Sequence, residues 1–124
     1  MASVLDETIV ASLLMVKREG FQTRLVKLFE SNTRDLLKDI DEALRTHNQK
    51  LLETSAHSLR SAASSVGAIR VSGLAQELEE IGRSGDWSLS VGRLVNLRDE
   101  ICHAVEALEL MFLAGERRKL EVGV

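Results

Sequence analysis

The segment His57-Ser58-Leu59-Arg60-Ser61-Ala62-Ala63-Ser64-Ser65-Val66-Gly67-Ala68 describes a helix with one apolar and one polar side. At about 3.6 residues per turn, the apolar residues here and just upstream fall on one stripe, as a core-facing side requires. That stripe consists of Leu52, Ala56, Leu59, Ala63 and Val66. The opposite side carries His57, Arg60, Ser61 and Ser64. The spacing therefore predicts an exposed histidine on a packed helix, among small or cationic neighbours.

The composition fits a single soluble domain over residues 1–124. The chain has 124 residues, 44% of them apolar, and no long uninterrupted apolar run, so it is large enough to bury one core. Its net charge of −3 comes from interleaved acids and bases, without the basic stripe that nucleic-acid binding requires. Met1–Leu14 lacks a signal-peptide pattern, and the single cysteine, Cys102, cannot form an internal disulfide. We therefore expect a cytoplasmic protein with no nucleic-acid partner and no direct membrane contact.

Hydrophobic periodicity and the absence of proline predict an all-α chain. Good helix formers dominate the segments between glycine-marked breaks. The predicted helices cover about residues 4–18, 21–45, 48–66, 70–83 and 90–114, and residues 115–124 form a C-terminal tail. Because short connections favour antiparallel neighbours, we expect an antiparallel up-and-down four-helix bundle, with the first segment as an additional N-terminal helix.

A few residues mark the expected helix ends and core-facing sides. Ser3 is the candidate cap of the first helix, and Thr46 and Gln49 have the spacing of a capping box for the third. Gly67 is the expected left-handed residue at the end of the third helix. The second helix is expected to bury Phe21, Leu25, Leu28, Phe29, Leu36, Ile40, Ala43 and Leu44.

An exposed neutral imidazole at His57 keeps a lone pair and is a competent nucleophile toward an activated phosphoryl group. Attack would give a phosphoramidate. Arg60, one turn along, supplies a cation whose planar donors suit phosphoryl oxygens. Glu79 on the following helix would accept the other ring N–H and fix the tautomer, although it also has the spacing to pair with Arg83.

A partner's active site needs room to close over the ring. Small side chains at Ser61, Ser64 and Ala68 would provide that room. Leu14 on the first helix is a candidate for an apolar docking rim near His57. These four residues form the predicted docking surface.

The same residues resemble the histidine-containing phosphotransfer (HPt) domains of two-component phosphorelays. The family pattern is His, any residue, Leu, Lys, Gly, two small residues, three further residues and then Gly, usually followed by a small or apolar residue. It is matched here by His57, Leu59, Arg60, Ala62, Ala63, Gly67 and Ala68. Resemblance continues along Leu25–Phe29 and Leu74–Asp86, and Glu79 matches a position where the family often has Gln or Glu in contact with the histidine. Two residues depart from the pattern: Arg60 replaces Lys, and Ser61 replaces a Gly that leaves room for the receiver.

The resemblance implies a histidine phosphocarrier that accepts a phosphoryl group on His57 from a receiver-domain aspartate and passes it to another receiver. It implies a phosphotransfer intermediate without autokinase activity, not a self-sufficient enzyme. The expected partners are response-regulator receiver domains or a hybrid sensor histidine kinase. The receiver would supply Mg²⁺, so we expect no metal or cofactor of the chain's own. We also expect a monomer.

Three other functions compete with this interpretation. A receiver-binding adaptor that does not accept phosphate stays open. The phosphoacceptor region of a sensor kinase would place an acid after the histidine, whereas Ser58 follows His57, and the chain has neither proline nor room for an ATP-binding domain. A metal site at Cys102 and His103 is disfavoured because adjacent helical side chains diverge. His47, in a turn, and His103 are therefore expected to be ordinary surface residues.

Overall fold

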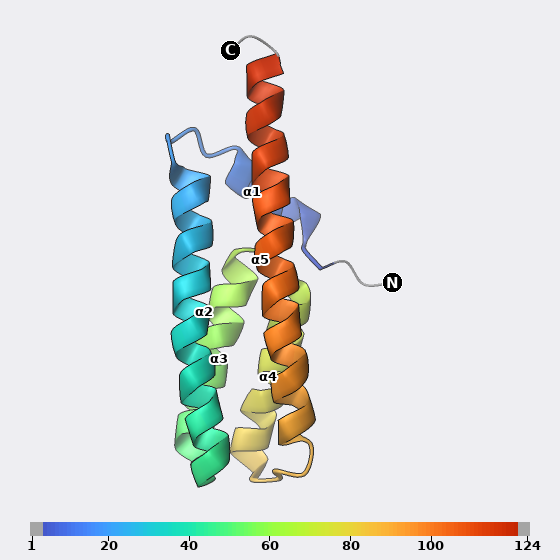
Figure 1. Cartoon of the computed structure of the whole chain (residues 1–124). Coiled ribbons are helices and arrows are strands. Elements are labelled where there is room, and N and C mark those ends of the chain that lie inside the picture. The colour runs from blue at the N-terminus through green and yellow to red at the C-terminus, as the bar shows by residue number, and fades with distance from the viewer. Residues whose placement is uncertain (1–3, 122–124) are drawn as a thin grey trace.

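The computed structural model describes residues 4–121, with side chains up to residue 114. Its helices are α1 (Glu7–Leu14), α2 (Phe21–Thr46), α3 (Gln49–Ser65), α4 (Ile69–Ser84) and α5 (Ser90–Glu121). The long helices α2 to α5 lie side by side, and α1 crosses one end of the bundle (Figure 1). α2 and α4 each pack against both α3 and α5. The predicted all-α four-helix bundle with an additional N-terminal helix is therefore confirmed.

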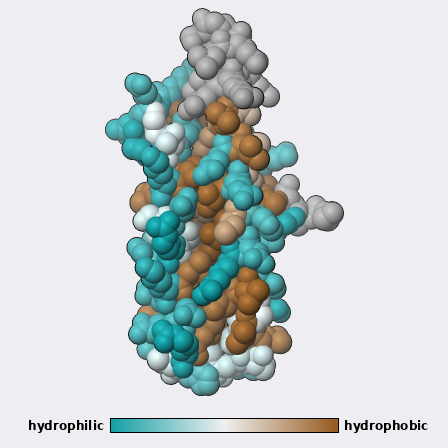
Figure 2. Space-filling view, viewed as in Figure 1, coloured by the Kyte–Doolittle hydropathy of each residue, from teal (hydrophilic) through white to brown (hydrophobic). Residues whose placement is uncertain are grey.

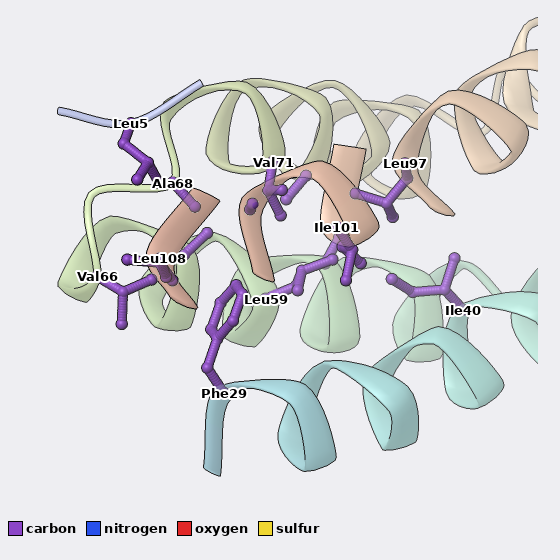
Figure 3. Packing of buried hydrophobic residues seen from close by; sticks show 14 of the residues in the cluster. Leu5, Phe29, Ile40, Leu59, Val66, Ala68, Val71, Leu97, Ile101 and Leu108 are labelled. Atoms are coloured by element: carbon purple, nitrogen blue, oxygen red, sulfur yellow. The ribbon is translucent and has the colours of Figure 1, made fainter. Parts of the chain in front are cut away.

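The core lies between the four long helices, where Phe29, Ile40, Leu59, Leu97 and Ile101 converge from α2, α3 and α5 (Figure 3). The stripe predicted on the third helix is buried throughout: its members Leu52, Ala56, Leu59 and Ala63 are 0% exposed, and Val66 is 2% exposed. Burial of this continuous stripe fixes the rotation of α3 about its axis. The polar side of α3, which carries the histidine, must therefore face outward.

The buried side of α2 differs from the prediction at Leu28, which is 66% exposed. One residue from Phe29 on a helix is a rotation of about 100°, and the rotation of α2 that buries Phe29 turns Leu28 outward. Val26 and Thr33 take the core positions instead. Thr33 is tolerated there because its Oγ1 donates to the Phe29 carbonyl at 2.8 Å.

The first helix starts later than predicted. The Asp6 carboxylate accepts from the amides of Thr8 and Ile9 at 3.0 and 3.4 Å, so α1 is capped by Asp6. Leu5, which was expected inside the helix, is buried in a segment that forms an isolated antiparallel bridge with Ala68. The prediction of residues 4–18 was wrong because apolar periodicity does not distinguish this buried segment from a helical turn.

The C-terminal end of α1 is fixed by a side chain of α2. Gln22 is buried, and its Nε2 donates to the carbonyls of Leu13 and Val16 at 2.9 and 3.1 Å. These bonds give the Leu13 carbonyl a second donor beside the Val16 amide at 3.3 Å, and they join the segment after α1 to α2. α1 ends at Leu14, short of the predicted end at residue 18.

One of the predicted caps is wrong and another cannot be described. Ser3 lies outside the described residues. The expected capping box of Thr46 and Gln49 does not form, because Asn48 caps α3 by accepting from the Leu51 amide at 3.1 Å. Thr46 instead donates its hydroxyl to a carbonyl of its own helix, α2. α3 therefore begins where Asn48 supplies the acceptor.

The turn between α3 and α4 forms around Gly67, as predicted. Gly67 has a φ of +75°, a left-handed conformation that favours glycine. The Ala68 amide donates to the Ala63 carbonyl at 2.9 Å and the Gly67 amide to the Ser64 carbonyl at 3.2 Å, which is the Schellman arrangement. The turn leads directly into α4, which packs antiparallel to α3.

The last helix is longer than predicted. α5 continues through Gly115 to Glu121, where residues 115–124 had been expected to form a tail. A single glycine inside a helix costs only about 1 kcal/mol relative to alanine, and the surrounding residues are good helix formers. Over residues 4–121, no helix has the length and apolarity needed to cross a bilayer.

At the end of the bundle away from α1, the rings of His47 and Trp87 stack on each other. The sequence did not predict this contact. His47 has a left-handed backbone, with a φ of 51°, and its ring stacks on Trp87 with centroids 4.8 Å apart. In the same loop as Trp87, Ser88 donates its hydroxyl and amide to Asp86, which lowers the pKa of that carboxyl. His47 therefore joins the α2–α3 and α4–α5 connections.

The groove between α2 and α5 exposes part of the apolar interior. Its lining includes Thr33, Leu37, Ile101, Cys102 and Val105. Figure 2 shows apolar residues running lengthwise between polar flanks on the face where α5 lies in front. The two helices that line this groove, α2 and α5, lie across the bundle from α3 and α4.

Gly82 allows the backbones of α3 and α4 to approach each other closely. A Cβ atom at this position would lie 2.8 Å from the Glu53 amide nitrogen and 3.1 Å from the Gln49 carbonyl oxygen. Gln49 also donates its side-chain amide to the Gly82 carbonyl at 3.2 Å. The two backbones therefore touch at Gly82, and a side chain there would push them apart.

We predict that Gly82→Ala lowers the free energy of unfolding by about 1–3 kcal/mol, because the added methyl group meets rigid backbone. Gly73→Ala in the same helix is the matched control, since no described atom beyond its chain neighbours and its own helix backbone lies within 4 Å of the added Cβ. That control should raise the free energy of unfolding by about 0.5–1 kcal/mol. Denaturant unfolding measures both. A Gly82→Ala variant as stable as the parent would contradict the close approach.

Candidate functional site

His57 lies midway along α3, on the side that faces away from the core. Its side chain is 56% exposed, whereas the neighbouring Ala56 and Leu59 are 0% exposed. The ring is therefore anchored by a buried helix face and is open to an approaching molecule. The sequence predicted this placement from the apolar stripe of α3.

Glu79 of α4 holds one side of the ring. Its carboxylate is nearly buried, with a side-chain exposure of 6%, and its Oε2 lies 2.9 Å from His57 Nδ1. Because a carboxylate only accepts hydrogen bonds, Nδ1 carries the proton in this contact. In the neutral ring, the lone pair then resides on Nε2. The predicted contact between His57 and Glu79 is present, and it leaves Nε2 as the nucleophilic atom.

Two guanidinium groups compensate the buried carboxylate. Arg60 Nη1 lies 3.2 Å from Oε1 of Glu79 as an ion pair without hydrogen-bond geometry, and Arg83 Nη2 donates to Oε2 at 3.4 Å. Arg60 Nη2 also lies 3.5 Å from His57 Nδ1, but both nitrogens are donors here, so this approach is a contact between donors. Glu79 therefore pairs with Arg83 and with His57 together, where the sequence had left these as alternatives.

The predicted docking residues are only partly on the surface. Ser61 is exposed, and Ser64 is exposed with its Oγ 3.0 Å from Ser72 Oγ. Ala68 is 0% exposed, so the prediction that its side chain lines a docking surface was wrong. The bridge with Leu5 covers it, because the turn after α3 brings Ala68 under the N-terminal segment.

Leu14 is half-buried against the core rather than displayed on the surface. It ends α1 where Gln22 binds the neighbouring carbonyls, beside the start of α2. The role of Leu14 in docking stays a prediction.

A second histidine offers a useful contrast. His103 on α5 is 55% exposed, and its Nδ1 lies 3.7 Å from Oε2 of Glu100, beyond hydrogen-bond distance. Arg70 of α4 approaches the other oxygen of Glu100 at 3.7 Å. This group resembles the His57 site in composition but lacks its short hydrogen bond. Among the described side chains, no cluster of three or more His, Cys, Asp or Glu is placed to hold a metal ion.

The arrangement around His57 supplies an exposed, oriented nucleophilic nitrogen, a carboxylate to stabilise a positive charge on the ring, and cations for an approaching anion. A family comparison agrees with this chemistry. The Hpt domain family model matches residues 24–110, more than half of the chain, and this range includes His57, Arg60, Glu79 and Arg83. The chain belongs to the Hpt domain family. Proteins of this family act in phosphorelay signal transduction.

Individual Hpt relatives agree in sequence and in fold. Over 64 residues the chain is 30% identical to the phosphorelay intermediate protein YPD1 of Candida albicans, an alignment that covers 52% of this chain and 35% of that protein. The crystal structure of histidine-containing phosphotransfer protein B from Pseudomonas aeruginosa PAO1 is similar, with a TM-score of 0.82 and 24% identity over 92% of this chain and 98% of that one. The protein MtHPt2 of Medicago truncatula has a TM-score of 0.79 and 21% identity over 98% of this chain and 84% of that one. These structures share the fold of the Hpt chain described here.

The tautomer inferred for His57 can be measured by nitrogen-15 NMR. In the neutral ring we expect Nδ1 to be protonated and Nε2 bare. Glu79→Leu removes the acceptor and should shift the proton toward Nε2, because nothing then holds the Nδ1–H form. Glu77→Leu, which removes an exposed carboxylate from the same helix, is the control and should leave the ring unchanged. A parent ring protonated at Nε2 would contradict the inferred hydrogen bond.

Proposed function

We propose that the chain is a histidine phosphocarrier: His57 accepts a phosphoryl group from the aspartyl phosphate of one receiver domain and passes it to another receiver. The observation that carries this proposal is the exposed imidazole whose Nδ1 is held by Glu79 at 2.9 Å, within a chain of the Hpt family. The chain acts as an intermediate and does not phosphorylate itself from ATP. Its partners are response-regulator receivers or a hybrid sensor kinase that contains one.

The chemical step uses the lone pair on Nε2. This nitrogen attacks the phosphorus atom of the aspartyl phosphate, a P–N bond forms, and the P–O bond to the receiver's aspartate breaks, returning its carboxylate. His57 keeps its Nδ1 proton throughout, so the phosphorylated ring carries a positive charge. Glu79 stabilises that charge through the same hydrogen bond, as a carboxylate does beside a catalytic histidine. Transfer to the next receiver is the reverse reaction.

The surroundings of His57 suit a docked receiver. The side chains of Ser61 and Ser64 are small and exposed, so they leave space around the ring for a receiver's loops to approach. Arg60, at 36% side-chain exposure, can turn from Glu79 toward a phosphoryl oxygen because it lies one helical turn from the ring. The receiver brings Mg²⁺, which neutralises the phosphoryl group during transfer.

The direct test is incubation with a radiolabelled, phosphorylated receiver. Acid-labile label should move onto the parent chain and should be absent from His57→Gln. His103→Gln is the matched control, since that ring is equally exposed but lacks a carboxylate within hydrogen-bond distance, and it should retain the label. If the chain binds the receiver but the label never appears on the chain itself, the result would instead support the receiver-binding adaptor.

Arg60→Ala should slow phosphotransfer by roughly ten- to a hundredfold, since a hydrogen bond to a charged group is worth about 1.5–3 kcal/mol. The fold should survive, because the side chain lies on the outer side of α3. Arg70→Ala removes an arginine of similar exposure, 33% against 36%, that pairs with Glu100 instead, and it should transfer at the parent rate. Rapid-quench kinetics measure both variants. Equal rates for Arg60→Ala and the parent would remove Arg60 from the mechanism.

A further inference from the structure

We propose that Arg83 is a positioning residue that acts on His57 through Glu79, by keeping Oε2 of the carboxylate at the Nδ1 position of the ring. The inference rests on the proposed phosphocarrier function for its kinetic consequence, but its structural part can be tested without any phosphotransfer. The Hpt family match assigns no role to Arg83. The sequence had indicated Arg83 only as a possible ion-pair partner of Glu79, four residues away on the same helix.

The first argument is that Arg83 and His57 share one acceptor. Oε2 of Glu79 lies 2.9 Å from His57 Nδ1 and 3.4 Å from Arg83 Nη2, while Arg60 approaches the other oxygen at 3.2 Å. Each oxygen therefore has its own cation, and the carboxylate cannot rotate without breaking a contact. Arg83 fixes the oxygen on which the ring depends.

The second argument comes from burial. An arginine four residues after a glutamate is common on helix surfaces and contributes little there, as with Arg34 and Glu30 of α2, whose side chains are 63% and 47% exposed. Arg83 has the same spacing and a similar exposure of 61%, but its partner Glu79 is only 6% exposed. A carboxylate with so little access to water depends on neighbouring cations to offset its negative charge. The Arg83 pair therefore matters more than its surface counterpart.

The third argument is that Arg60 has two tasks. It lies beside Oε1 of Glu79 in the unphosphorylated structure, and in the proposed function it turns toward the phosphoryl group. When it does so, Glu79 keeps Arg83 as its remaining cation while the incoming phosphoryl group adds negative charge nearby. Arg83 then holds the carboxylate in place during the step in which the ring becomes positive.

The test compares Arg83→Ala, Arg83→Lys and the surface control Arg34→Ala, first by nitrogen-15 NMR of the His57 ring. Arg83→Ala should lower the share of the neutral ring that is protonated at Nδ1, and Arg83→Lys should restore most of it. Arg34→Ala should match the parent. An unchanged tautomer in Arg83→Ala would overturn the proposal.

Phosphotransfer rates then separate action through Glu79 from direct contact with phosphate. Arg83→Ala should slow transfer several-fold in the parent and should add nothing in a Glu79→Leu background, because the residue it acts through is gone. An undiminished effect in that background would overturn the proposal in favour of direct phosphoryl contact. If the parent accepts no phosphoryl group at all, the phosphocarrier function fails, while the NMR comparison still decides the role of Arg83.

Discussion

The hydrogen bond from His57 to the nearly buried carboxylate of Glu79 is the contact on which the site depends. A histidine on a helix surface is ordinarily free to rotate and to exchange tautomers. Here one ring nitrogen is bound to a group that has little access to water, so the other nitrogen is both defined and exposed. The carboxylate in turn requires compensation, which Arg60 and Arg83 provide from two different helices.

The bundle holds that carboxylate in place through the close contact of α3 and α4. The Schellman turn at Gly67 sends α4 back along α3 immediately, and the missing side chain at Gly82 lets the two backbones touch. Glu79 lies one turn before Gly82, and its carboxylate contacts the His57 ring directly, at 2.9 Å. The apolar stripe around Leu59 fixes the rotation of α3, so the ring faces that carboxylate.

Much of the fold and part of the site could be predicted from the sequence, because both follow from helical periodicity. The stripe through Leu59 gave the orientation of α3 and hence the exposure of His57, and a four-residue step from Glu79 indicated the pairing with Arg83. Several predictions failed where long-range contacts override the local pattern. Leu5 leaves the predicted helix to pair with Ala68, which is thereby removed from the surface. The stack of His47 on Trp87 joins two connections far apart in sequence, and no local signal marks it.

The most direct measurement of the central claim is the position of the phosphoryl group on the ring. The chain, labelled with nitrogen-15 and phosphorylated by a receiver domain, can be examined at alkaline pH by NMR, where phosphorus couples to the nitrogen that carries it. The hydrogen bond from Nδ1 to Glu79 predicts phosphorus on Nε2 of His57. Phosphorus on Nδ1, or on any other residue, would contradict it.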